Sequence, residues 1–177
     1  MKIRCPWARG EANVHYHDTE WGVPQHDDRV SFEFLVLEGA QAGLSWSTIL
    51  LKRENYRRAF DGFDPAGMAN YRGARLEKLM KDPGIVRNRL KITAAIQNAK
   101  SFLAVRKEYG TLDRYIRQFV DGQTLENAWQ SRPRVPTHTA EADRMSRDLL
   151  HRGFKFVDQP SAMHSCRWSS WCVTITA

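Results

Sequence analysis

Apolar residues recur at intervals of three and four through most of the chain, whereas runs that alternate apolar and polar residues are nearly absent. Such intervals place side chains on one face of an α-helix, and alternation is typical of a strand. The longest apolar stripe consists of Leu90, Ile92, Ala95, Ile96, Ala99, Phe102 and Leu103. The stripe continues until Gly110, a residue that favours a helix end. The pattern predicts an all-α protein.

Capping residues divide this pattern into separate helices. A helix over residues 28–42 leads to Ser45, which is suited to N-cap a second helix over 46–60. Because proline has no amide proton to lose at the first helical position, Asp64 and Pro65 predict the start of a short helix that ends near residue 71.

Further helices follow in the second half of the chain, beginning with a brief one over 75–80. Thr111 is expected to cap a helix through residue 120. Thr139, with Glu141 in the first turn, opens a helix that closes at Gly153. A chain of 177 residues without internal repeats is long enough for one well-filled core. We expect a single compact, bilobal helical domain.

Basic residues outnumber acidic ones, with 27 Lys and Arg against 20 Asp and Glu, so the formal net charge is +7. An excess of this size favours a polyanionic partner, most simply nucleic acid. Charge alone leaves this interpretation even with its alternative, a helical small-molecule-binding protein whose basicity is incidental. The distribution of charge, which includes a basic, proline-stiffened loop over 131–136, favours nucleic acid.

The chain has no feature typical of a membrane or secreted protein. No apolar run approaches the roughly 20 residues that cross a bilayer, and the N-terminal segment lacks the apolar core of a signal peptide. Cys5, Cys166 and Cys172 are odd in number and lie at the two ends of the chain, which is no disulfide framework. We expect a cytoplasmic protein that contacts no membrane.

Residues 81–89, Lys-Asp-Pro-Gly-Ile-Val-Arg-Asn-Arg, look like the hairpin of a helix-hairpin-helix motif. Gly84 permits a tight turn whose amides face a phosphate, and such a turn grips the DNA backbone without reading its sequence. The positive charge comes from Arg87, Arg89 and Lys91. From this motif alone, an ordinary turn between helices on a solvated basic face is an equal alternative.

The first fifty residues combine aromatic rings with one carboxylate and two potential metal ligands. Glu38 ends an apolar helical run over 32–38, and a turn over 41–45 then leads into Trp46. Glu38 and Trp46 are thereby placed on the two walls of one helix-turn-helix, and aromatic faces with an acid can hold a flat cationic base. The alternative is that Glu38 makes a structural hydrogen bond and that the tryptophans pack in the core.

Several segments resemble, in the same order, the bacterial 3-methyladenine DNA glycosylase I family. They are residues 5–7, 16–24, 37–46, 52–56, 84–87, 91–92 and 152–157, so the resemblance runs from Cys5 to Val157. Collinear matches of this kind are more specific than a single motif. The resemblance implies a monomeric helix-hairpin-helix-superfamily enzyme of base-excision repair. Such an enzyme flips an alkylated adenine out of double-stranded DNA and hydrolyses its N-glycosidic bond.

The resemblance also implies roles for the pocket residues. Glu38 and Tyr16 hydrogen-bond the edge of the flipped base, and Trp46 stacks on its face. Trp7 and Trp21 complete the pocket. Alkylation at N3 puts positive charge on the purine and makes it a good leaving group. Glu38 is therefore expected chiefly to recognise the base and stabilise its charge, with activation of water as an open secondary role.

The turn after Glu38 lies where a base-flipping enzyme needs a wedge, because the vacated stack must be filled while the nucleotide is outside the duplex. The candidates are Gln41, Gly43 and Leu44. A leucine in a turn is also commonly a small cap on the core. No lysine is indicated as a Schiff-base nucleophile, so we expect hydrolysis without strand cleavage.

Members of the family hold a structural zinc with a cysteine and a histidine near the N-terminus and a His-x-x-x-Cys pair near the C-terminus. Cys5 and His17 match the first half, but no His-x-x-x-Cys follows Val157. We expect a glycosylase domain over 1–157 and an atypical tail over 158–177, for which a change of reading frame just after Val157 is our hypothesis. Zinc binding by this chain stays open. The alternative function is a catalytically silent module that binds DNA or damaged bases.

Overall fold

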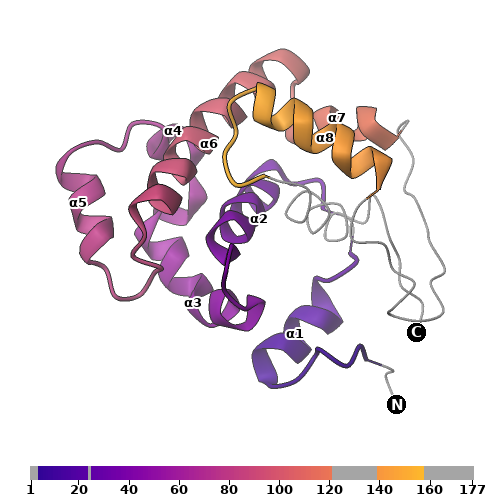
Figure 1. Ribbon diagram of the computed structural model, residues 1–177, viewed down its shortest axis with the longest axis vertical. Helices are drawn as coiled ribbons and strands as arrows, with labels where there is room; N and C mark the ends of the chain where they lie inside the picture. The colour runs from indigo at the N-terminus through magenta and orange to yellow at the C-terminus, as the bar shows by residue number, and fades with distance from the viewer. Residues whose placement is uncertain (1–3, 24, 121–138, 158–177) are drawn as a thin grey trace.

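The computed structural model describes residues 4–23, 25–120 and 139–157. All regular elements in these ranges are helical, as Figure 1 shows, so the all-α prediction is confirmed. No helix there is long and apolar enough to cross a membrane. The elements are α1 (Glu11–Thr19), α2 (Asp28–Gln41), α3 (Trp46–Ala59), η1 (Asp61–Phe63), α4 (Pro65–Met68), α5 (Ala74–Lys81), α6 (Arg89–Tyr109), α7 (Leu112–Arg117), η2 (Gln118–Val120) and α8 (Ala140–His151).

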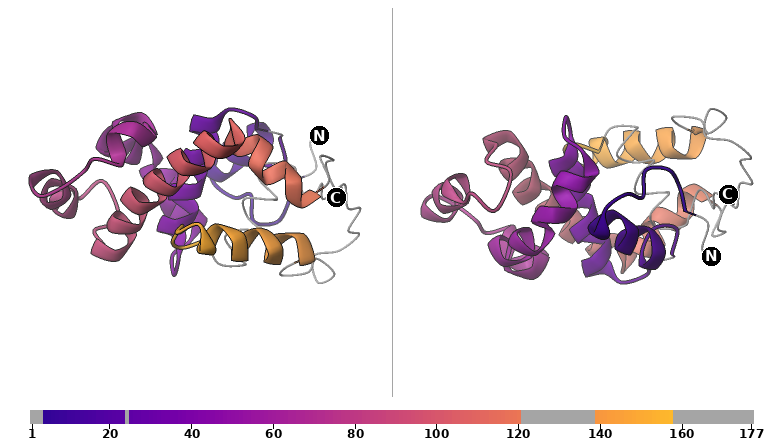
Figure 2. Two further views of the ribbon diagram at one scale, coloured as in Figure 1. Left: turned by 90° about the horizontal axis from the view of Figure 1, so that it is seen from above. Right: turned by 90° about the horizontal axis from the view of Figure 1, so that it is seen from below.

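The 21-residue helix α6 is the centre of the packing, since it contacts α2, α4, α5 and α7. In both views of Figure 2, α4 and α5 lie towards one end of the molecule, and α7 and α8 lie towards the other. Helix α2 packs against both α6 and α3. The helix that carries Glu38 therefore runs through the middle of the protein.

Four helices begin at the caps that the sequence predicts. The Ser45 side chain accepts a hydrogen bond from the Thr48 amide at the start of α3, with a distance of 3.2 Å. Side chains of Asp64, Thr111 and Thr139 accept amide hydrogen bonds at the starts of α4, α7 and α8. Each of these bonds satisfies a donor that has no partner inside its helix. Local sequence therefore determines where these helices begin.

Helix α1 has no counterpart in the predicted pattern. Tyr16 is its one buried residue, and the helix begins after Gly10, at φ +78°, without a side-chain cap. A helix with one buried position has no apolar stripe to recognise. The predicted helix over 111–120 also differs, because α7 ends at Arg117 and the chain tightens into the 3₁₀ turn η2.

Two hydrophobic clusters fill the interior. The larger one joins α2, α3, α6, α7 and α8 through side chains such as Phe32 and Tyr115, which are fully buried. The smaller one centres on Tyr16 and Phe34. Trp46 packs against both clusters. The first residue of α3 therefore stands where the two clusters meet.

The predicted hairpin lies between the end of α5 and the start of α6. Gly84 does not have a left-handed backbone there. Glycine is needed because a Cβ at this position would lie 2.9 Å from Oδ1 of Asp82 and 3.0 Å from the Cβ of Asn55 on α3. The Gly84 amide donates to Oδ1 of Asp82 at 2.7 Å. Close packing on α3 selects glycine, and the helix-hairpin-helix identity of the turn stays a prediction.

Candidate active site

Glu38 lies in the interior of the protein, on a helix whose residues 32–40 are all buried. The residue is 5% exposed, and no described group donates a hydrogen bond to its carboxylate. Burial raises the pKa of this carboxyl from 4.5 to about 8. A buried acid without a partner carries a free-energy cost, which a bound cation or a hydrogen-bond donor would offset.

Aromatic rings from three helices contact one another beside this acid. The ring centroids of Tyr16 on α1 and Trp46 on α3 are 5.4 Å apart, and Phe34 stacks on Trp46 at 6.2 Å with a 27° angle between the planes. Phe34 precedes Glu38 by four residues and therefore shares its helix face. Burial raises the pKa of the Tyr16 phenol, and the Glu38 carboxylate adds to this rise, so the two side chains are close. The structure brings together the acid, the phenol and the indole that the sequence singles out.

Two polar groups of this cluster have no hydrogen-bond partner in the part of the chain that the structure describes. The indole N–H of Trp46 is buried without a hydrogen-bond acceptor. The Glu38 carboxyl on the neighbouring helix has no donor within the described residues. Buried N–H groups are nearly always paired in proteins. An unpaired carboxyl beside aromatic faces suits a planar ligand that stacks on those faces and carries hydrogen-bond donors on its edge.

Trp7 and Trp21 form a second row of rings next to Tyr16. The Trp7 centroid lies 6.2 Å from that of Tyr16 and 5.4 Å from that of Trp21. His17 extends this row, because its ring stacks on Trp21 with centroids 5.2 Å apart and planes at 22°. The two tryptophans therefore support the Tyr16 wall of the cluster.

Cys5 and His17, the predicted first half of a zinc site, are neighbours. The Cys5 amide donates to Nε2 of His17 at 3.3 Å, and Nδ1 of the same ring lies 3.1 Å from Oδ1 of Asp18. Both nitrogens of the His17 ring are therefore engaged within the protein.

A closed zinc site needs four ligands. Among residues 4–23, 25–120 and 139–157, no group of three His, Cys, Asp or Glu side chains is arranged to hold a metal ion. The donors in this part of the chain do not form a tetrahedral site. The segment 158–177, where the sequence lacks the second pair of ligands, lies outside the described residues, and zinc binding stays a prediction.

A buried ion-pair cluster supports the aromatic rings, and the sequence patterns do not predict it. Arg53 on α3 donates to Oε1 of Glu33 at 2.5 Å and to both carboxylate oxygens of Glu20 at 2.7 and 2.8 Å. Its guanidinium lies 4.6 Å from the ring centroid of Phe34, within the range of a cation–π interaction. One residue in the sequence could have indicated this cluster. Glu33 lies inside the apolar run over 32–38, and a charge at a buried helical position requires a partner. Arg53 and Phe34 are the site residues that sequence reasoning missed.

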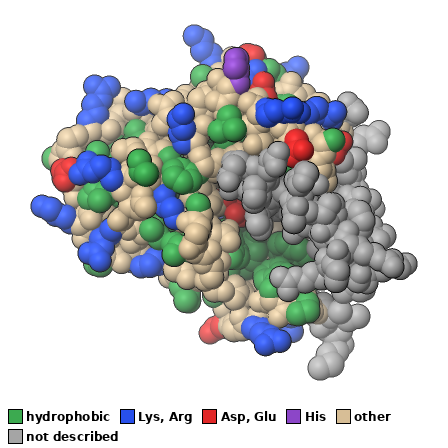
Figure 3. Space-filling view, in the orientation of Figure 1, with side chains coloured by type: hydrophobic (Ala, Val, Ile, Leu, Met, Phe, Trp, Pro, Cys, Tyr) green, Lys and Arg blue, Asp and Glu red, His purple; other side chains and the backbone are tan. Residues whose placement is uncertain are grey.

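The turn between α2 and α3 carries the wedge candidates. Gly43 has a left-handed φ of +75°, and the Leu44 amide donates to the Gln41 carbonyl at 2.6 Å. The Leu44 residue is 40% exposed, which is uncommon for a large apolar side chain in this protein. Figure 3 shows a hollow next to the grey residues, with hydrophobic side chains on its floor. An exposed leucine at the turn after Glu38 is consistent with a wedge, whose role stays a prediction.

The predicted backbone-binding residues fall into two groups. Arg87 is exposed, and Arg89 pairs with Glu77 at 2.8 Å on the surface. Exposed pairs of this kind contribute about 0–1 kcal/mol and exchange readily for a phosphate. Lys91 donates instead to two carbonyl oxygens at the end of α2. The structure therefore separates Lys91 from the two arginines.

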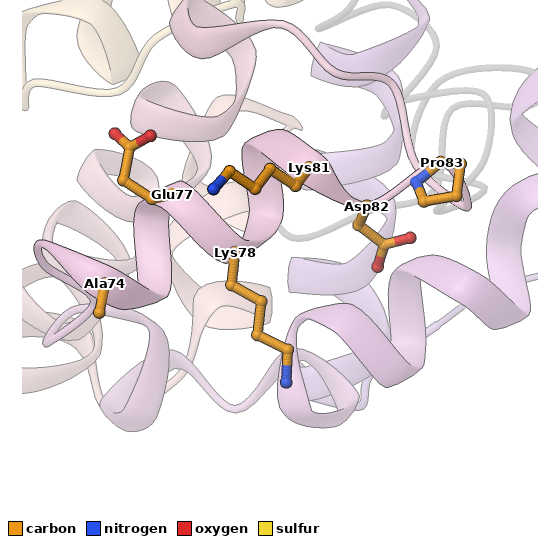
Figure 4. A pocket seen from close by; sticks show the side chains of 6 residues that line it. All are labelled: Ala74, Glu77, Lys78, Lys81, Asp82 and Pro83. Atoms are coloured by element: carbon orange, nitrogen blue, oxygen red, sulfur yellow. The ribbon is translucent and has the colours of Figure 1, made fainter.

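An open groove of about 610 Å³ lies along α5 and the start of the hairpin. It is lined by Ala74, Glu77, Lys78, Lys81, Asp82 and Pro83. Figure 4 shows the side chains of Lys78 and Lys81 extending from α5 in different directions. This lining shares no residue with the Glu38 cluster and carries both signs of charge. The groove is therefore separate from the candidate active site.

Comparison with known proteins agrees with this geometry. The model of the methyladenine glycosylase family matches residues 7–166, and so extends beyond Val157. DNA-3-methyladenine glycosylase 1 of Escherichia coli (strain K12) is 42% identical over 155 residues, which cover 87% of this chain and 83% of that protein.

Solved structures give the same result. A crystal structure of 3-methyladenine DNA glycosylase I superposes with a TM-score of 0.94 at 40% identity, covering 99% of this chain and 97% of that one. A tyrosine-to-phenylalanine variant of 3-methyladenine DNA glycosylase I, in complex with 3-methyladenine, superposes with a TM-score of 0.89 at 30% identity, covering 93% and 88%. The chain belongs to the methyladenine glycosylase family.

Proposed function

We propose that this protein is a DNA glycosylase of base-excision repair that hydrolytically releases 3-methyladenine from alkylated DNA. The observation that carries the proposal is the Glu38 carboxyl, which is buried beside Tyr16 and has no hydrogen-bond partner among the residues that the structure describes. The names of the relatives support the same activity, since one is a DNA-3-methyladenine glycosylase and another has been crystallised with 3-methyladenine.

The chemistry requires recognition of a cation more than a strong acid. Methylation at N3 leaves positive charge on the adenine, so the bond between the base and C1′ of the deoxyribose is already weak. As this bond breaks, its electron pair moves to the base, which leaves as neutral 3-methyladenine. A water molecule adds to C1′ and loses one proton, so that the products are the base, an abasic site and H⁺.

The pocket residues act on the charge and the edge of the base. Glu38 ionises when the cationic base arrives, because an opposite charge nearby favours the charged form of a carboxyl. Trp46 stacks on the face of the base, and Tyr16 hydrogen-bonds its edge. Trp7 and Trp21 hold the Tyr16 wall in place. Since an unmodified adenine is neutral, it gains less from the carboxylate and the aromatic faces, which gives selectivity for the damaged base.

The DNA partner is double-stranded, and the protein acts on it as a monomer. Leu44, with Gln41 and Gly43, fills the stack that the flipped nucleotide leaves. The hairpin with Gly84, Arg87 and Arg89 grips the phosphate backbone. The backbone stays intact after base release, because no lysine is used as a nucleophile. A cytoplasmic location stays a prediction.

Incubation of methylated duplex DNA with the protein, followed by chromatography of the released bases, tests this function. We expect free 3-methyladenine and a DNA product that contains abasic sites. Glu38→Gln should abolish release while DNA binding is retained. Binding of damaged DNA by the unaltered protein without any release would favour the alternative, a catalytically silent binding module.

A further inference from the structure

Lys91 links two parts of the molecule that are far apart in sequence. Its Nζ donates to the carbonyl oxygen of Ala40 at 2.9 Å and to that of Ala42 at 2.5 Å, which are 51 and 49 residues earlier in the chain. Its backbone amide donates to Oδ1 of Asn88, the N-cap of α6, at 3.2 Å. Lys91 therefore joins the first turn of α6, just after the hairpin, to the end of α2, just after Glu38.

The end of α2 needs a cation of this kind. The last carbonyl oxygens of a helix have no partner inside it and carry partial negative charge. The last turn of α2 contains no basic residue of its own. Lys91 uses two of its three N–H donors on these oxygens, and partial burial lowers the pKa of its ammonium group. Movement of this side chain to a phosphate would leave both carbonyl oxygens unpaired.

A second lysine makes a parallel link. Nζ of Lys52 on α3 lies 3.1 Å from the Pro83 carbonyl oxygen and 3.4 Å from that of Gly84, and donates to both. Helices α2 and α3 are thus each tied by one lysine to the hairpin or to the helix that follows it. The turn over 41–45 connects these two helices. This turn is therefore held between two elements that are both linked to the hairpin.

We propose that Lys91 is a positioning residue, which holds the turn over 41–45 in a fixed register with the hairpin. The inference rests on the proposed function and takes Lys91 out of the set of direct phosphate contacts. With both elements in register, the side chain that enters the DNA stack and the groups that hold the backbone act on neighbouring nucleotides. Register matters because a misplacement of about 1 Å can cost about 100-fold in rate.

The experiment compares Lys91→Met with Arg87→Met, which removes an exposed candidate for a phosphate contact next to the same hairpin. For each full-length variant, DNA affinity is measured over a range of salt concentrations. Single-turnover release of 3-methyladenine is measured with the protein in excess, and binding of free 3-methyladenine is followed by tryptophan fluorescence. Hydrogen exchange of the peptide that contains residues 41–45 reports on the turn itself.

We expect Lys91→Met to lower single-turnover release by about tenfold or more, to speed exchange over 41–45, and to change binding of the free base by less than about threefold. The slope of log affinity against log salt should equal that of the unaltered protein, because no phosphate contact is lost. Arg87→Met should reduce the magnitude of this slope by about 0.9, the value for one phosphate.

Two results would overturn the inference. One is a decrease of about 0.9 in the magnitude of the salt slope for Lys91→Met, with unchanged hydrogen exchange over 41–45. A phosphate ligand would behave in this way. The other is unchanged release together with unchanged exchange. Should Lys91→Met unfold, Lys91→Gln, which keeps an N–H donor, is measured in the same way. A failure of the proposed function is distinct, since the unaltered protein would then release no base, whereas slope and exchange still report on Lys91.

Discussion

Burial of the Glu38 carboxyl destabilises its charged form, and a bound cation would offset this free-energy cost. Its pKa of about 8 means that the folded protein without ligand holds a proton there at neutral pH. In the unfolded chain the same carboxyl titrates near its usual 4.5. The folded state therefore binds one proton more than the unfolded state between these two values, and the stability of the protein must depend on pH.

The sign of this dependence gives the first prediction. Because the pKa is raised on folding, the contribution of Glu38 is fully present below about pH 4.5 and is lost as the pH rises towards 8. The loss amounts to at most roughly 1.4 kcal/mol per pH unit. Glu38→Gln has no such proton to lose. Relative to the unaltered protein, the variant should become steadily more stable as the pH rises from 5 to 8, as measured by urea unfolding.

Glu54 provides the control for this measurement. Its side chain is 72% exposed and pairs with Arg57 on the surface of α3. Glu54→Gln should therefore follow the pH dependence of the unaltered protein. The same pH dependence in Glu38→Gln and in the unaltered protein would show that Glu38 is not held protonated by the fold.

At the scale of elements, Arg53 decides how α1 is attached to the rest of the protein. It is 9% exposed and bridges Glu33 on α2 to Glu20, the residue that ends α1. Tyr16 reaches the cluster from this short helix, whose other residues are not buried. The position of the Tyr16 ring therefore depends on the ion pairs at the end of α1 as well as on its own packing.

Arg53→Met is expected to destabilise the protein by about 3 kcal/mol, because the half-buried Glu20 loses its partner and the buried Glu33 loses one of its two arginines. Arg57 continues to pair with Glu33 at 2.9 Å, which limits the loss. Free 3-methyladenine should bind more weakly as α1 loosens. Urea unfolding and tryptophan fluorescence measure the two effects. Arg58→Met, an exposed position on the same helix, should change stability by no more than about 0.5 kcal/mol; equal effects of the two substitutions would contradict this account.

Close packing of the hairpin on α3 gives a second prediction at this scale. In Gly84→Ala the new Cβ would lie 2.9 Å from Oδ1 of Asp82 and 3.0 and 3.1 Å from Cβ and Cγ of Asn55, so the hairpin must shift. Overpacking of this kind costs about 1–3 kcal/mol. DNA affinity should fall, whereas free 3-methyladenine should bind as before, because Gly84 is not part of the Glu38 cluster. Fluorescence anisotropy with labelled duplex DNA measures the first quantity.

Removal of the opposing side chain tests the cause of this effect. Asn55→Gly deletes two of the three atoms that the new Cβ would meet and leaves Oδ1 of Asp82 in place, so the double variant Gly84→Ala with Asn55→Gly should recover part of the DNA affinity. Full DNA affinity of the single variant Gly84→Ala would show that the position of the hairpin does not matter for binding.

At the scale of the whole molecule, the net charge of +7 predicts how affinity for DNA responds to salt. Each phosphate neutralised by a basic side chain contributes about −0.9 to the slope of log affinity against log salt, so two contacts, from Arg87 and Arg89, would give a slope of roughly −2. The test is a titration of labelled duplex DNA at several salt concentrations between about 50 and 200 mM. A small-molecule-binding protein with incidental basicity would show little dependence on salt.

The sequence by itself determined the helical class and most helix starts. Caps such as Ser45, Asp64, Thr111 and Thr139 act on amides two or three residues away, and the apolar stripe of α6 repeats over one helical turn. Signals that operate over a few residues can be read without the fold. The order of family-like segments also pointed to Glu38, Tyr16 and Trp46 as one site, although it said nothing about their contacts. Helix α1 was not predicted, because one buried residue makes no pattern.

Only the tertiary structure decided which polar groups have partners. The raised pKa of Glu38 arises from helices packed around α2, and the bridge from Arg53 joins residues 20 and 33 positions away. In the sequence, Lys91 is one more basic residue beside a hairpin. In the structure, its hydrogen-bond partners lie 49 and 51 positions earlier in the chain. Burial and pairing depend on residues brought together across the whole chain. For this reason local patterns found the candidates, and packing determined what each of them does.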